Sequence, residues 1–387
     1  MFNYKEDQLA ELGAKITTQE IIQQPELWYE TYEVFQKNQE RSSYFMSQIL
    51  PKNNLRVIFT GAGTSAYIGD AILPYIKEFG DEKRFDFQSV PTTTLLSNPH
   101  AYFKADIPTV LVSFARSGNS PESLASVKLG EQLVNDFYQI IITCAASGNL
   151  AQYVKDNTRC LLLLMPERSN DQGFAMTSSF TCMTLTALML FDEKFSIQEK
   201  EEIVKLLCKM GDHVVNQFET IKEILSVTYD RIVYLGSGPL TGLAREVQLK
   251  VLELTAGKVT TVFDSPLGFR HGPKSFVTDS TLIFVFLSNQ AYTRQYDIDM
   301  LNELYSDQIT KNIVVFGVGS INFKGKTWPF DSIFLKIPDA YLSLPYAMIG
   351  QIIGLISAIK LKIIPDTPCS TGTVNRVVQG VKIYSLN

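Results

Sequence analysis

Short apolar runs rich in β-branched residues alternate with longer stretches of helical periodicity along the whole chain. The short runs predict strands and the longer stretches predict helices. Most of the short runs are apolar over nearly their whole length, without the alternation of a half-exposed strand, which is typical of strands buried on both faces of a parallel sheet. The pattern therefore predicts an α/β protein with crossover helices between parallel strands. The predicted strands cover residues 55–60, 109–114, 138–143, 159–164, 231–235, 282–287, 312–316 and 332–337.

The second group of four predicted strands repeats the first. The first strand of each group ends in a similar turn, Gly61-Ala62-Gly63 in one and Gly236-Ser237-Gly238 in the other. Cys144 likewise corresponds to Gly317 and Pro166 to Pro338, at an offset that drifts by only three residues. A repeat of this length predicts two similar doubly wound domains in tandem, with helices on both faces of each parallel sheet.

This repeat divides the chain into five segments. We expect N-terminal helices over residues 1–50, a first domain over 51–192, a helical connector over 193–227, a second domain over 228–362 and a tail over 363–387. The end of the tail, residues 377–384, is too apolar to stay in water. We therefore expect the tail to pack over a site or against a partner subunit.

Composition removes several classes of protein. Of 387 residues, 45% are hydrophobic and 19% charged, which is typical of globular domains and not of disordered chains. Lys and Arg total 35 against 40 for Asp and Glu, without a dense basic run, so we expect no nucleic-acid partner. Five widely spaced cysteines and three histidines without metal-ligand spacing predict reduced thiols and no metal.

The sequence also predicts where the protein lies in the cell. The N-terminus carries acidic residues at once and lacks the apolar region of a secretory signal. The uncharged windows 172–191 and 340–359 are long enough to span a membrane but contain Ser, Thr, Gln, Gly or Pro, so we read them as buried core helices. We expect a cytoplasmic protein without a membrane partner.

Ligands of open parallel sheets bind beyond the carboxyl ends of the strands, so the strand-end loops are the candidate sites. In the first, Gly63, Thr64 and Ser65 open a helix, where glycine permits close approach of an anion and helix N–H groups attract it. The same segment fits the dinucleotide-binding GxGxxG/A pattern, with Asp86 near the position of a ribose-binding acid. On this loop alone, a turn without a ligand remains an equal alternative.

A second loop favours phosphate. Arg116, Ser117, Asn119 and Ser120 lie between an apolar strand and Pro121, a residue suited to the first turn of a helix. Hydroxyl, amide and guanidinium donors together suit the several acceptor oxygens of a phosphate monoester. The alternative is that Ser120 only caps the helix.

The second half of the chain carries candidate acid–base groups. Glu246, Lys250 and Glu253 lie on one predicted helix at spacings of four and three, so Lys250 shares a face with each carboxylate. Glu253 lies between leucines near the helix end, where the helix dipole disfavours a charged carboxylate, and this position suits a general base. Lys250 either stabilises negative charge on a substrate or simply pairs with Glu246. His271 lies in a loop rich in Gly and Pro, where a structural histidine is unusual.

Together these segments resemble the sugar isomerase (SIS) domain family, in the double-domain arrangement of the isomerase half of glucosamine-6-phosphate synthase. Residues 115–122, 177–181 and 267–273 are more similar to AgaS-type proteins, which are galactosamine-6-phosphate deaminase/isomerases, also called tagatose-6-phosphate ketose/aldose isomerases. The resemblance covers nearly the whole chain beyond the first 50 residues or so. It implies two flavodoxin-like SIS domains.

The resemblance also implies roles for particular residues. Ser65, Ser117 and Ser120 would bind the sugar phosphate, Glu253 would shuttle a proton, and His271, contributed by a neighbouring subunit, would assist ring opening. The partner is then a second copy of the chain, in a homodimer with shared active sites or a higher oligomer. The other substrate-binding or phosphate-binding candidates are Gly63, Thr64, Arg116, Asn119, Thr177, Ser178 and Lys250.

Two departures from the synthase limit this transfer. Ala115 and Arg116 replace a serine and a glutamine in the second phosphate loop, and the tail stretch 376–381 lacks the synthase's lysine, the next one being Lys382. Without the synthase's glutamine-hydrolysing domain, we expect ammonia to be released rather than incorporated. The expected reaction converts galactosamine 6-phosphate to tagatose 6-phosphate and ammonia by proton transfer from C2 to C1. Because nothing is oxidised overall in this reaction, we expect no cofactor.

Three alternatives remain open. An aldose–ketose isomerase of a hexose 6-phosphate would share the proton transfer without releasing ammonia. A sugar-phosphate sensor would not require both Glu253 and His271, and a dehydrogenase rests on the first glycine turn alone.

Overall fold

The computed structural model describes residues 2, 4–155, 157–378 and 380–386; Met1, Asn3, Asp156, Gln379 and Asn387 lie outside the described residues. The strands are β1 Leu55–Thr60, β2 Phe85–Ser89, β3 Thr109–Ala115, β4 Phe137–Thr143, β5 Cys160–Leu164, β6 Arg231–Gly236, β7 Thr260–Asp264, β8 Thr281–Phe286, β9 Ile313–Val318 and β10 Lys326–Phe330. The helices before β6 are α1 Glu6–Glu11, α2 Lys15–Ile22, α3 Gln24–Lys37, α4 Gln39–Ile49, α5 Thr64–Phe79, α6 Thr92–Ser97, α7 Pro99–Tyr102, α8 Pro121–Leu133, α9 Asn149–Tyr153, η1 Glu167–Ser169, α10 Ser178–Phe191, α11 Ile197–Val215 and α12 Phe218–Ile224. Those after β6 are α13 Pro239–Leu254, α14 Pro266–Phe269, η2 Pro273–Phe276, α15 Ala291–Asp307, η3 Ser332–Lys336 and α16 Asp339–Lys360.

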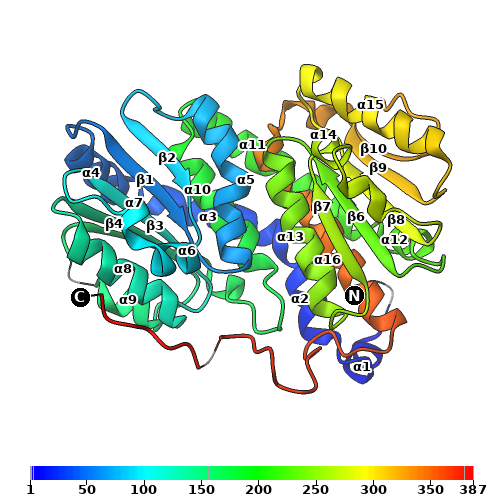
Figure 1. Cartoon of the computed structure of the whole chain (residues 1–387), viewed down its shortest axis with the longest axis horizontal. Coiled ribbons are helices and arrows are strands. Elements are labelled where there is room, and N and C mark those ends of the chain that lie inside the picture. The colour runs from blue at the N-terminus through cyan, green and yellow to red at the C-terminus, as the bar shows by residue number, and fades with distance from the viewer. Residues whose placement is uncertain (1, 3, 156, 379, 387) are drawn as a thin grey trace. The chain divides into compact units, whose positions relative to one another are not determined.

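The strands form two parallel five-stranded sheets (Figure 1). The first sheet has the order β2-β1-β3-β4-β5, and the second has the matching order β7-β6-β8-β9-β10. Both are the flavodoxin-like doubly wound order, in which the strand order reverses beside the first strand. The predicted fold class, two tandem doubly wound α/β domains, is confirmed.

The predicted central strands agree with the structure to within one or two residues at most ends, but the prediction for residues 332–337 is wrong. That segment forms the 3-10 helix η3, because the Asp331 carboxylate accepts the N–H of Ile333 and starts a helical turn. The edge strand is instead β10, which contains Pro329. A proline is tolerated there because an edge strand has a partner on one side only. The repeat between the two halves therefore loses its register at the last strand of each sheet, β5 in the first and β10 in the second.

The chain divides into two compact units that are each discontinuous in sequence. We call the unit Glu26–Gln172, Ser178–Lys200 and Thr371–Asn387 the first-sheet unit. We call the unit Met1–Pro25, Gly173–Thr177 and Glu201–Ser370 the second-sheet unit. Each unit is described by itself below.

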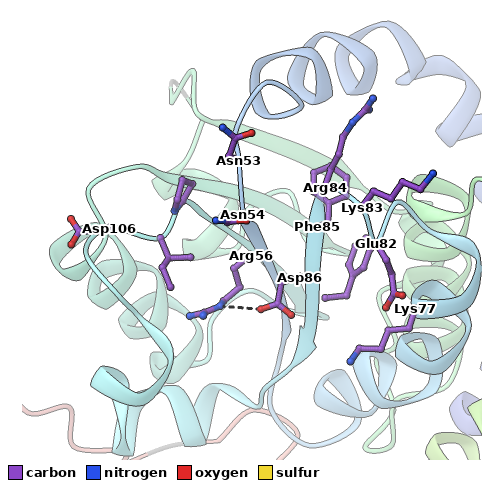
Figure 2. Close-up of a pocket in the computed structure, with 13 residues that line it drawn as sticks. Asn53, Asn54, Arg56, Lys77, Glu82, Lys83, Arg84, Phe85, Asp86 and Asp106 are labelled. Atoms are coloured by element: carbon purple, nitrogen blue, oxygen red, sulfur yellow. Dashed lines mark hydrogen bonds and ion pairs between the residues drawn. The ribbon is translucent and has the colours of Figure 1, made fainter.

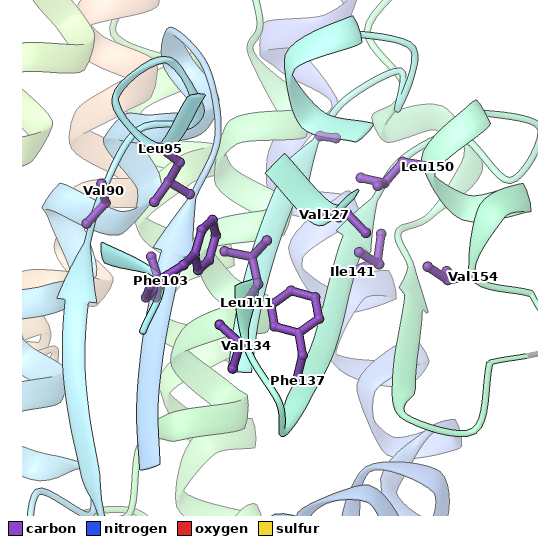
Figure 3. Packing of buried hydrophobic residues seen from close by; sticks show 12 residues of the cluster. Val90, Leu95, Phe103, Leu111, Val127, Val134, Phe137, Ile141, Leu150 and Val154 are labelled. Carbon is purple, nitrogen blue, oxygen red and sulfur yellow. The ribbon is translucent and has the colours of Figure 1, made fainter. Parts of the chain in front are cut away.

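The first sheet is covered by helices on both faces. Alternate residues of its strands point to opposite sides: Ile58 packs toward α6, α8 and α9, whereas Phe59 stacks near Phe114 and contacts Phe191 of α10. Figure 3 shows the core on the α8 side. Every residue of β3 and β4 is buried, as expected for central strands. These rigid strands fix the positions of the loops at their carboxyl ends.

The second sheet repeats this arrangement. Leu235 and its neighbours pack against Phe269 and the α15 side chains, while Phe286 on the other face contacts Tyr346 of α16. Within the described residues, α16 is the one helix long and apolar enough to cross a bilayer, with a mean hydropathy of 1.7 in its most apolar window. Because 94% of that window is buried in the protein, the predicted core helix at residues 340–359 is confirmed. Ser178–Phe191 is a second, shorter buried apolar helix.

Candidate active site

The first candidate loop joins β1 to α5. Gly63 precedes α5 with φ 55° and ψ −131°, a conformation that other residues rarely adopt. Gly61 lies so close to Ser65 that an added Cβ would lie 2.6 Å from the Ser65 carbonyl carbon. Thr64 and Ser65 follow, both buried, in the first turn of the helix. This tight turn places the N–H groups of α5 at the carboxyl end of β1, an arrangement that attracts anions.

The second candidate loop, residues 116–120, joins β3 to α8 and lies beside the first. Thr60 at the end of β1 pairs with Ser113 of β3, so the two loops leave neighbouring strands at nearly the same level. The sheet order reverses between these two strands. Both predicted phosphate loops therefore border the switch point of the first-sheet unit, where open α/β proteins bind ligands.

The polar side chains of the second loop have different partners. The Ser117 hydroxyl accepts the N–H of Asn119 at 3.3 Å and still has its own proton to donate. The Ser120 hydroxyl donates to Glu122 at 2.5 Å, so a phosphate would have to displace that bond. The Asn119 amide oxygen accepts the N–H of Asn149 at 3.0 Å, which ties this loop to the start of α9. Of these three side chains, Ser117 is the one best arranged to bind an anion.

Arg116, Thr177 and Ser178 are all buried. Arg116 donates to the main-chain carbonyl of Arg376 in the C-terminal tail at 2.6 Å. Ser178 begins α10, and its N–H donates to the Asp171 carboxylate at 3.0 Å. Asp171 was not among the predicted site residues, because it lies seven residues before Ser178 and so outside the spacing of a local helix cap.

The acid–base candidates of the second-sheet unit meet on α13. The Lys250 ammonium lies 2.7 Å from a Glu253 carboxylate oxygen and 3.4 Å from a Glu246 oxygen. Burial lowers the pKa of Lys250 and is the largest single effect, but the two carboxylates together outweigh it and raise the pKa above its usual value. Lys250 is therefore a protonated amine held between two carboxylates. Glu246 and Lys250 are almost fully buried, whereas the Glu253 side chain is 26% exposed and is the member that a substrate could reach.

His271 lies in an exposed loop between α14 and η2. Ion pairs hold the loop on both sides of it, since Arg270 and Lys274 contact Glu303 of α15 at 2.7 and 2.6 Å. In the described part of the chain, no hydrogen bond joins His271 to Glu253. The structure thus brings Lys250 and Glu253 together, whereas His271 is not hydrogen-bonded to either of them within the described residues.

The switch point of the second sheet contains carboxylates. Asp297 of α15 accepts the Ser237 hydroxyl at 2.5 Å and the Ser288 N–H at 3.1 Å. Asp339 accepts the Ser288 hydroxyl at 2.5 Å and the Asn289 N–H at 2.7 Å. Burial raises the pKa of Asp297 to about 6, against the opposing effect of these two donors to it. Two carboxylates lie at the switch point of the second sheet, the place where the candidate loops of the first sheet would bind a phosphate. Their negative charge disfavours an anion there.

A polar pocket of about 600 Å³ lies beside the amino ends of the strands of the first sheet, at the end of the sheet opposite the two candidate loops (Figure 2). In it Arg56 of β1 and Asp86 of β2 form an ion pair at 3.5 Å. A ribose-binding acid lies at the carboxyl end of the second strand, but Asp86 is the second residue of β2. The geometry therefore gives no support to the dinucleotide-binding alternative.

No group of three or more His, Cys, Asp or Glu side chains that could hold a metal ion occurs among the residues that the structure describes.

Comparisons with known proteins place the chain in a family. Residues 49–192 match the SIS domain. The chain is 41% identical over 379 residues to the D-galactosamine-6-phosphate deaminase AgaS of Shewanella sp. (strain ANA-3), covering 98% of this chain and 94% of that protein.

Solved structures agree with this relationship. A protein from Clostridium novyi NT superposes with a TM-score of 0.94 at 41% identity, covering 100% of this chain and 99% of that one. The tagatose-6-phosphate ketose/aldose isomerase of Escherichia coli superposes with a TM-score of 0.84 at 38% identity, covering 95% and 96%. The chain therefore belongs to the AgaS family of SIS-domain proteins.

Proposed function

We propose that the protein is an amino-sugar phosphate deaminase/isomerase that converts galactosamine 6-phosphate and water to tagatose 6-phosphate and ammonia. The observation that carries the proposal is the Glu246–Lys250–Glu253 cluster on α13, with one reachable carboxylate. The cluster lies in a chain 41% identical, over nearly its whole length, to a protein named for this deamination. A positioned carboxylate and a histidine are the groups that aldose–ketose proton transfer needs.

The first-sheet unit anchors the substrate. The phosphate binds at the loops after β1 and β3, where Gly63, Thr64 and Ser65 open α5 and Ser117 offers a hydroxyl proton. The helix N-termini add partial positive charge, and the buried Arg116 adds a full one. Ser178 at the start of α10 contributes further to substrate binding.

The second-sheet unit carries out the proton transfer. His271 protonates the ring oxygen and takes up the proton of the C1 hydroxyl as the sugar opens to its aldehyde form. Glu253 then removes the proton from C2 while the C1 oxygen gains a proton, which gives an enolamine. Glu253 returns its proton to C1 as the nitrogen loses one, which gives a ketimine. Water adds to the ketimine and ammonia leaves, which gives the ketose. Lys250 holds the Glu253 carboxylate through a charge-assisted hydrogen bond of 2.7 Å.

We propose further that the enzyme is a cytoplasmic homodimer or higher oligomer with shared active sites. His271 is exposed, and no hydrogen bond within the described chain ties it to Glu253. A partner subunit that contributes its own His271 would complete the site. Measuring the mass of the protein in solution, together with mixing Glu253 and His271 variants to recover activity, tests the shared site.

The decisive experiment measures ammonia and ketose together. Purified protein is incubated with galactosamine 6-phosphate, glucosamine 6-phosphate and their N-acetyl forms. We expect equimolar ammonia and tagatose 6-phosphate from galactosamine 6-phosphate. Absence of both products from every amino sugar would exclude the deaminase.

The isomerase alternative is favoured by solved structures such as the 38% identical Escherichia coli protein, which is named a tagatose-6-phosphate ketose/aldose isomerase. Such an enzyme would act on a hexose 6-phosphate and keep its C2 oxygen. Adding galactose 6-phosphate to the same panel separates the two activities, because the isomerase forms tagatose 6-phosphate from it without ammonia.

A further inference from the structure

The C-terminal tail reaches the second phosphate loop within the first-sheet unit. Arg116 donates from Nη2 to the main-chain oxygen of Arg376 at 2.6 Å. The Arg376 guanidinium in turn donates to the main-chain oxygen of Asp171, from Nε at 3.0 Å and also from Nη2. A chain of hydrogen bonds therefore joins three segments that lie far apart in sequence.

Asp171 gives this chain a rigid anchor. Its carboxylate is fully buried and accepts the N–H groups of Ser178 and Ser179 at 3.0 and 2.9 Å, and also the Ser179 hydroxyl at 2.5 Å. These bonds hold the residue at the N-terminus of α10, a helix that is buried along almost its whole length. Because the Arg376 side chain bonds to the backbone of this residue, the position of the tail depends on a fixed point in the core.

The tail is also held beyond Arg376. Residues 381–386 line a cavity of about 800 Å³ together with α6 and α8, and Gln132 of α8 donates to the Leu386 carbonyl at 3.3 Å. Loss of the Arg376 side chain would therefore loosen the tail at the phosphate loop and leave its end attached to α8. A local effect of this kind can be separated from unfolding.

Orientation of the Arg116 guanidinium matters for phosphate binding. The group offers five N–H donors in a fixed plane, and rotation of its flexible stem changes which of them a ligand meets. A carbonyl oxygen at 2.6 Å from Nη2 fixes this plane before a ligand arrives. The carbonyl belongs to Arg376, so the side chain of Arg376 controls Arg116 through the backbone of the tail.

We propose that Arg376 is a positioning residue that holds the tail across the phosphate loop, so that its main-chain carbonyl orients Arg116 toward the phosphate group of the substrate. The proposal rests on the proposed function, because it requires that Arg116 contacts this phosphate. The resemblance to the synthase assigns no role to either arginine.

The test is a double-mutant cycle on the full-length protein, with Arg116→Ala, Arg376→Ala and the double variant. Calorimetry measures the affinity for inorganic phosphate and, in a Glu253→Gln background that does not turn the sugar over, for galactosamine 6-phosphate. We expect Arg116→Ala to weaken both by about tenfold or more, the effect of losing a charged hydrogen-bond donor. Arg376→Ala should weaken them nearly as much, and the double variant no further than Arg116→Ala, since one residue acts through the other.

Two further variants separate positioning from general damage. Arg376→Lys keeps one donor for the Asp171 carbonyl and should recover part of the affinity. Lys382→Ala removes a positive charge from the same tail, where the ammonium lies over the Tyr384 ring, and should leave affinity unchanged. In turnover, Arg376→Ala should raise KM and change kcat little, with the same denaturation midpoint as the wild type.

The possible failures differ from one another. Unchanged phosphate affinity in Arg116→Ala overturns both the phosphate site and this proposal. Weakened affinity in Arg116→Ala, combined with unchanged or additive behaviour in Arg376→Ala, overturns the positioning role alone. Equal loss of affinity in Lys382→Ala also overturns it, because the effect would then be one of overall charge.

Discussion

The switch points of the two sheets have nearly the same backbone conformation but carry side chains of different chemistry. Gly63 and Gly238 both precede a helix with nearly the same angles, φ 55° and ψ −131° against φ 57° and ψ −124°. The following residues differ: Thr64 and Ser65 open α5, whereas Pro239 and Leu240 open α13. Proline removes one N–H donor and leucine offers none in its side chain, so only the first turn keeps its full set of donors.

The loops after the third strand of each unit, β3 and β8, differ in the same way. In the first-sheet unit this loop carries Arg116 and Ser117, whereas in the second-sheet unit Asp297 and Asp339 bond to Ser288 at the corresponding place. A bound anion would meet two carboxylates there. The duplicated fold creates two equivalent positions, and the side chains decide which of them can hold a phosphate.

The largest expected effect tests whether proton transfer and phosphate binding are carried out by different units. Glu253→Gln should lower kcat by about 10²–10⁴-fold, because an amide cannot accept the C2 proton. Phosphate affinity should stay near the wild-type value, since the anchoring loops are elsewhere in the chain. Steady-state kinetics and calorimetry on the same preparation check both halves of this prediction. Turnover within a factor of a few of wild type would remove Glu253 from the mechanism.

The next effect concerns the buried cluster on α13. Lys250→Met leaves the fully buried Glu246 carboxylate without its cation, so the free energy of unfolding should fall by about 3–5 kcal/mol. Urea denaturation measures the loss. Lys258→Met, a change at an exposed lysine just beyond the same helix, serves as the matched control and should be nearly neutral. Equal stability of the two variants would contradict the ion-pair interpretation.

A smaller effect should depend on pH and belong to the second-sheet switch point. Because the pKa of Asp297 is raised to about 6, the folded state keeps its proton in a range where the unfolded chain has lost it. The free energy of unfolding should therefore fall by roughly 2–3 kcal/mol as pH rises from about 4 to 7, and this part should disappear in Asp297→Asn. Denaturation curves across this range test the difference. Parallel pH profiles for the two proteins would show that Asp297 has an ordinary pKa.

The smallest effect compares one serine from each switch point. Ser117→Ala should weaken phosphate binding by about tenfold, because a hydrogen bond to a charged group is lost. Ser237→Ala should leave phosphate affinity unchanged, since Ser237 bonds to Asp297 instead. Calorimetric titration with inorganic phosphate gives both values. Equal weakening in the two variants would mean that the second switch point also binds anions.

The predictions from sequence are most accurate where burial is complete. The central strands β3 and β4 are buried at every position, and their predicted ends are within a residue of those in the structure. The edge strands β2, β7 and β10 were missed, because each has one open side and carries several polar residues. The incorrect strand at residues 332–337 had apolar residues but also a capping aspartate, and the cap decided its structure.

The sequence by itself determined the buried central strands, the duplication and the pairing of Lys250 with its helix neighbours, because these depend on local spacing. Only the tertiary structure decided which loops border a switch point, and that Asp297 and Asp339 fill the second one. It also decided that Arg376, 260 residues from Arg116, bonds to it. Such contacts depend on how strands are ordered and how a tail folds back, and no local pattern of residues records that order.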